Sequence, residues 1–180
     1  MSGPVDRVPG IVLLGLLTWH ALEKVHTGVL PEMLWACHVA TALAILGSFA
    51  GRPGWVVVGG VFHLVVGLPG YVLDVLLHQV TTLSSAMLHV ATPAAGLFAA
   101  RRAGVPVGTG LAGAALFIVC TALARALTAP ALNINLAFAA YDIWPDGTPA
   151  WLAWGANTAF LTALLLGAEQ VMVRAFGRPR

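Results

Sequence analysis

Apolar residues occur along this chain in long runs separated by short turns. A helix that crosses a bilayer needs about 20 mostly apolar residues, and several turns between the runs are rich in Gly and Pro, which punctuate helices. The runs that meet this length are Pro9–His26, Leu30–Ala50, Trp55–Leu77, Thr81–Ala100, Val105–Leu127 and Trp151–Phe176. The pattern predicts an all-α, polytopic membrane bundle of about six transmembrane helices.

The third run contains a Pro-Gly pair, Pro69-Gly70, well before its end. Proline removes a backbone donor and bends or breaks a helix, and a break inside a membrane is tolerated only where protein surrounds it. The run is therefore either one kinked helix or a short helix followed by a re-entrant piece.

Composition supports a membrane domain. The chain has 180 residues, of which 59% are hydrophobic and only 9% are charged, whereas soluble domains carry about 25% charged residues. We expect residues 1–180 to form a single integral membrane domain. The net charge of +2 gives no reason to expect a nucleic-acid partner. Ile11–Trp19 is expected to stay as part of the first helix, because His20, Glu23 and Lys24 follow where a signal peptide needs small residues.

The charged residues predict an orientation. With six spans, one face of the membrane receives Arg7, Arg52, Arg101, Arg102, Arg174, Arg178 and Arg180. Basic residues accumulate on the cytoplasmic side of membrane proteins, so both termini are predicted to be cytoplasmic. The segment Thr128–Pro149 then forms an extracytoplasmic loop. The expected location is a bacterial-type inner (plasma) membrane.

Polar side chains inside apolar runs are the candidate chemistry, because they are costly in a membrane and usually functional. Cys37 and His89 fall at similar depth on different predicted helices, and histidine can activate a cysteine nucleophile. Asp74 and His78 are candidates to orient or polarise this pair. Ser84 and Ser85 are alternative hydroxyls, and Cys37 can equally be read as a small buried apolar residue.

The histidines leave two cofactor alternatives open. A zinc or iron ion needs only three protein ligands and an open position. The candidate ligands are His20, Glu23, His38, Asp74, His78 and His89. A b-type haem needs two axial histidines, and the candidates for these are His38, His63 and His89. A site without any cofactor is the third alternative.

Three segments carry a resemblance to a known family. They are LPEMLWACHVATALAILG, SSAMLHVATPAAGLFAARRAGV and ALNINLAFAAYDIWP. In these segments the chain resembles the YwaF-like integral membrane proteins and their animal relatives, which are cysteine–histidine acyltransferases acting on ether phospholipids. The resemblance implies that Cys37 accepts the acyl group, that His89 is its base, and that Asn133 and Asn135 lie near the site. A looser similarity exists to threonine–histidine intramembrane hydrolases of fatty-acid esters.

These observations give three function hypotheses. The first is an integral membrane enzyme that acts on lipid acyl or ester groups by Cys/His chemistry in the extracytoplasmic half of the bundle. The second is a haem- or metal-binding protein for electron transfer or metal handling. The third is a structural subunit of a membrane complex. Membrane lipids are the expected partners, together with further copies of the chain or a larger membrane complex.

Overall fold

The computed structural model describes residues 7–78, 81–139, 144–145 and 147–179, and over these ranges the chain is helical and contains no strand. The helices are α1 (Val8–His26), α2 (Ala36–Phe49), α3 (Pro53–Phe62), α4 (Leu68–His78), α5 (Leu83–Ala103), α6 (Thr109–Leu127) and α7 (Ala150–Phe176). A π-helical segment, η2 (His63–Gly67), joins α3 to α4. Short 3₁₀ turns are η1 (Leu30–Leu34), η3 (Pro130–Leu132) and η4 (Ile134–Leu136).

Long apolar helices confirm the predicted membrane bundle. Within the described ranges, five helical segments are long and apolar enough to cross a membrane: Val8–His26, Pro53–His78, Leu83–Ala103, Thr109–Leu127 and Ala150–Phe176. With α2, which has 14 residues, they account for the six predicted transmembrane segments, which we call the six rods. The chain is therefore an all-helical, multi-pass membrane protein.

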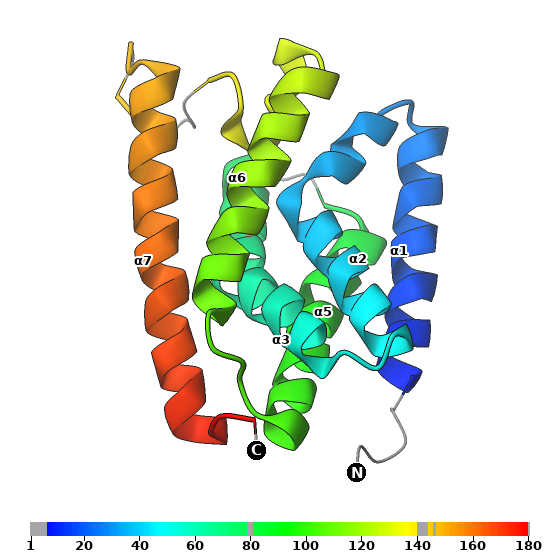
Figure 1. Cartoon of the computed structure of the whole chain (residues 1–180). Coiled ribbons are helices and arrows are strands. Elements are labelled where there is room, and N and C mark those ends of the chain that lie inside the picture. Colours follow the sequence, from blue (N-terminus) through cyan, green and yellow to red (C-terminus); the bar gives the residue numbers. More distant parts are fainter. Residues whose placement is uncertain (1–6, 79–80, 140–143, 146, 180) are drawn as a thin grey trace.

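The six rods alternate in direction, which gives the bundle two distinct ends. The start of α1 and the end of α7 lie at the same end in Figure 1, which we name the termini end. The opposite end, the loop end, carries η1, η3 and η4. α1 packs against α2 and α5, while α7 packs mainly against α6. These two helices consequently form the opposite edges of the bundle in Figure 1.

The third rod is continuous through Pro69, so it is a helix with a π-helical segment and not a re-entrant piece. In η2 the N–H of Leu68 bonds the carbonyl of His63, five residues earlier. A single π-helical turn is a common local adjustment inside α-helices and is frequent at functional sites. The proline follows directly, at the second position of α4.

The second predicted helix differs from the structure at its start. The sequence predicted one helix over Leu30–Ala50, but residues 30–34 form the 3₁₀ turn η1 and α2 begins only at Ala36. The start of α2 therefore lies about one and a half turns further along the chain than predicted. This shift changes the surroundings of Cys37.

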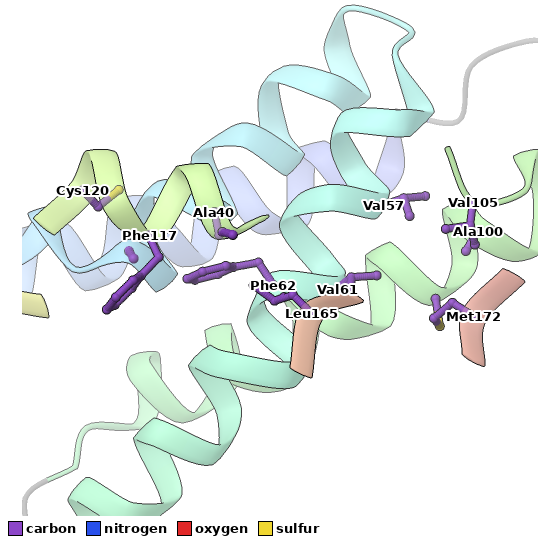
Figure 2. Close-up of a cluster of buried hydrophobic side chains, with 12 residues drawn as sticks. Ala40, Val57, Val61, Phe62, Ala100, Val105, Phe117, Cys120, Leu165 and Met172 are labelled. Atoms are coloured by element: carbon purple, nitrogen blue, oxygen red, sulfur yellow. The ribbon is translucent and has the colours of Figure 1, made fainter. Parts of the chain in front are cut away.

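The apolar core fills the middle of the bundle. Phe62, Phe117 and Leu165 meet there from three different helices, and Val61 and Met172 extend the cluster toward the termini end. Figure 2 shows these side chains together with Cys120, which is buried among them.

Candidate functional site

Four buried histidines come together from four different elements, and we call them the histidine cluster: His20 of α1, His38 of α2, His63 of η2 and His89 of α5. The rings of His20 and His38 are in contact, with centroids 4.7 Å apart. Those of His63 and His89 meet edge to face, with centroids 4.6 Å apart. His38 lies close enough to both His20 and His89 to interact electrostatically with each. Side chains from well-separated parts of the sequence thus meet in one cluster.

The hydrogen bonds of two cluster members define which ring nitrogen carries the proton. His38 Nδ1 lies 3.1 Å from the carbonyl oxygen of Glu32, and His89 Nδ1 lies 2.8 Å from that of Ser85. A carbonyl can only accept, so Nδ1 donates in both rings. In the neutral form, Nε2 of His38 and of His89 is therefore a lone-pair acceptor.

In the other two histidines Nδ1 also faces an oxygen, in each case that of a hydroxyl group. Ser84 donates its single hydroxyl hydrogen to Glu23, so His20 Nδ1 donates to Ser84 Oγ across 2.7 Å. Thr41 donates to the carbonyl of Cys37, and its oxygen faces His63 Nδ1 at 3.4 Å. The Nε2 atoms of His20 and His63 are buried and have no hydrogen-bond partner. The histidine cluster thus offers acceptor nitrogens and no spare ring donors.

Cys37 is the second residue of α2, a position that the sequence did not predict. The next backbone N–H, that of His38, donates to the carbonyl of Trp35 at 2.9 Å and closes the first turn of the helix beside Cys37. The N-terminus of a helix carries a partial positive charge that favours an anion, and reactive cysteines are often found there. The helix start thus favours a negative charge at Cys37, while its burial among apolar side chains opposes one, so the thiol needs a base to lose its proton. The second cysteine, Cys120, lies inside α6 in the apolar core.

A hydrogen bond between α2 and α5 relates the positions of Cys37 and His89. Thr41 and Thr92 are joined through their hydroxyl groups at 2.9 Å. Thr41 follows Cys37 by one helical turn, and Thr92 follows His89 by about one turn. Since both helices run from the loop end to the termini end, Cys37 and His89 lie on the same side of this contact. His63 and Gly67 of η2 occupy the space beside Cys37.

The loop after α6 reaches the start of α2 through Asn135, which is buried. Its amide oxygen accepts from the N–H of Ala36 at 2.8 Å, and its amide nitrogen donates to the carbonyl of Leu34 at 2.9 Å. Asn133 instead bonds within its own loop, to backbone groups of Phe138 and Ala139. Of the two asparagines, Asn135 thus makes the contact next to Cys37.

Tyr71 is a neighbour of the cluster that the sequence analysis missed. Its ring stacks on that of His89, with centroids 4.3 Å apart, and its hydroxyl bonds Thr81. The only sequence signal was its position directly after Pro69-Gly70. A tyrosine there packs over His89 because the π-helical segment shifts the face that α4 presents to α5.

The remaining predicted residues occupy other positions. Asp74 and His78 form an exposed pair at the end of α4, with Oδ1 and Nδ1 2.8 Å apart, and their role in orienting or polarising the site stays a prediction. Glu23 is partly exposed and reaches the cluster through Ser84. Among the residues described, no three His, Cys, Asp or Glu side chains are arranged to hold a metal ion. Asp142, which was expected in the outer loop, lies outside the described residues.

Comparison with known proteins adds no assignment: no family model, curated protein or solved structure matches this chain.

Proposed function

We propose that this protein is an intramembrane enzyme of a bacterial-type plasma membrane that transfers or hydrolyses lipid acyl groups through Cys37 and His89. The observation that carries the proposal is the position of Cys37 at the start of α2, on the same side of the Thr41–Thr92 contact as His89. A thiolate so placed attacks carbonyl carbon readily. The surrounding apolar helices make a lipid ester the natural substrate class.

Cys37 and His89 together account for every bond change and proton transfer in the proposed reaction. His89 Nε2, the ring nitrogen left free by the bond of Nδ1 to Ser85, accepts the thiol proton of Cys37. The sulfur attacks the ester carbon, the carbon–oxygen bond breaks, and the leaving alcohol takes the proton back from His89. The acyl group remains on Cys37 as a thioester until an acceptor alcohol or water removes it by the same steps in reverse.

The test uses purified protein in detergent with p-nitrophenyl palmitate as the acyl donor. We expect a burst of p-nitrophenolate close to one per chain, and a palmitoyl adduct on Cys37 that hydroxylamine removes. Cys37→Ala should abolish the burst, and His89→Ala should slow it by about 100-fold or more, the usual contribution of a general base. Cys120→Ala is the matched control, because it removes the chain's other cysteine. A burst that survives Cys37→Ala would overturn the proposal.

A metal ion is the second candidate: the cluster offers acceptor nitrogens, although in the described residues no three ligands are arranged to hold an ion, so ligands would have to move on binding. Histidines that bind metals usually donate their other ring N–H to an oxygen, as all four rings do here. A haem held by His63 and His89 would have to separate two rings whose centroids lie 4.6 Å apart. Elemental analysis and a visible spectrum of the purified protein distinguish the candidates. Stoichiometric metal that is lost in His89→Ala, or a Soret band, would contradict the cysteine mechanism.

A further inference from the structure

One side chain, that of Asn135, joins the loop after α6 to the start of α2. Asn135 accepts from Ala36 and donates to Leu34, so its amide binds the backbone on both sides of Trp35. These bonds connect residues about 100 positions apart in the sequence. Ala36 is the first residue of α2 and Cys37 is the second. Asn135 therefore holds the backbone on which the thiol is mounted.

The Asn135 contact takes the place of an N-cap. The first N–H groups of a helix have no partner within the helix, and a capping side chain usually comes from the residue just before it. Here that residue is Trp35, whose side chain makes no such bond. Asn135 supplies the missing acceptor for Ala36 from the loop. The N–H of His38 donates to the carbonyl of Trp35 at 2.9 Å, so the loop and the chain's own backbone together fix the turn that carries Cys37.

The backbone of the loop is shaped to deliver this amide. Asn135 has a φ of +55° and Asn133 a φ of +40°, the left-handed region that asparagine tolerates better than most residues. Ile134 between them is fully buried and packs with Ala124 and Ala137. The loop is thus a packed element with a defined conformation, and Asn135 points from it into the bundle.

We propose that Asn135 is a positioning residue for Cys37: by fixing the first turn of α2 through Leu34 and Ala36 it aims the thiol. The proposal rests on the acyl-transfer function for its catalytic meaning. Its structural content, that Asn135 controls the reactivity of Cys37, is testable without any acyl substrate.

Two glycine substitutions give a matched test. Asn135→Gly and Asn133→Gly each remove a loop amide at a left-handed position that glycine adopts without strain. Only Asn135→Gly removes the bonds to α2, because Asn133 binds its own loop. Both are made in the Cys120→Ala background. The probes are N-ethylmaleimide, which reports the thiol alone, and p-nitrophenyl palmitate.

We expect Asn135→Gly to slow alkylation of Cys37 and the p-nitrophenolate burst by about tenfold or more, since small misplacements of a reacting group are costly. Asn133→Gly should change either rate by less than about threefold. Thermal unfolding of both variants shows whether each is folded, and rates are compared at a temperature where both are. Equal rates in the two variants would overturn the positioning role. A burst absent from the unsubstituted protein, with the difference in alkylation intact, would overturn the acyl-transfer function alone.

Discussion

At the scale of single residues, the spacing of α3 and α5 depends on two glycines. A Cβ atom added to Gly60 would lie 2.4 Å from the Cα of Gly96, and one added to Gly96 would lie 2.5 Å from the Cα of Gly60. Backbone cannot yield as a flexible side chain can. This close approach lies next to Thr92, about one turn from His89, so it also sets the depth of the candidate site.

Gly60→Ala is predicted to destabilise the protein by about 1–3 kcal/mol, the usual cost of overpacking a core. The measurement is the midpoint of thermal unfolding in detergent. Gly155→Ala is the control, because a Cβ there meets nothing within 4 Å and alanine favours a helix by up to about 1 kcal/mol. A Gly60→Ala protein as stable as the Gly155→Ala protein would show that α3 and α5 are not packed this closely.

The functional residues were predictable from the sequence to different extents. Histidines in apolar runs stand out, and His20, His38, His63 and His89 were all identified in this way. Their protonation patterns were not, because the partners come from other parts of the chain: Ser84, for example, is 64 residues from His20. Asn135 reached the site only through a family resemblance, since an asparagine in a loop has no distinguishing pattern of its own.

At the scale of elements, hydropathy located the six rods but not their local irregularities. Residues 30–35 are as apolar as a helix, so the start of α2 could not be read from hydropathy. Proline at the start of η1 suits any first helical turn and does not tell a 3₁₀ turn from an α-helix. The π-helical segment was equally hidden in the sequence, because it depends on the contacts of His63 with His89 and of Gly67 with Cys37.

The end of α7 is tied to the turn between α5 and α6 by Glu169. This buried carboxylate accepts from the N–H groups of Gly108 and Gly110, at 3.1 and 2.8 Å, and from Arg178 at 2.8 Å. Arg178 also donates to the carbonyls of Val105 and Pro106. A negative charge at the start of α6 is favourable by the helix dipole. These hydrogen bonds therefore join α7, the segment after it and the start of α6 at the termini end of the bundle.

Arg178→Ala is predicted to lower the unfolding free energy by about 1–3 kcal/mol, because it leaves a buried carboxylate short of one charged donor. Thermal unfolding of Arg178→Ala, Glu169→Gln and the double variant measures the coupling, and the double variant should lose less than the sum of the single changes. Arg174→Ala, which removes an exposed arginine in the last turn of α7, is the control. Additive losses would show that the two side chains act independently.

At the scale of the whole molecule, the structure places Arg7, Arg52, Arg101, Arg102, Arg174 and Arg178 in turns or helix ends at the termini end. Lys24 and Arg125 lie toward the loop end, on the last turns of α1 and α6. The positive-inside rule then predicts that the termini end is cytoplasmic. The histidine cluster and Cys37, nearer the loop end, would face the extracytoplasmic half of the membrane.

Single cysteines in a Cys37→Ala, Cys120→Ala background test this orientation. Thr27→Cys lies at the loop end just after α1, and Val107→Cys lies at the termini end between α5 and α6. Both positions are exposed, Val107 at 84%, and neither change alters a charge. A membrane-impermeant thiol reagent should label Thr27→Cys in intact cells and Val107→Cys only after permeabilisation. The reverse pattern would place Cys37 in the cytoplasmic half, where an acyl donor would have to come from the inner leaflet or the cytosol.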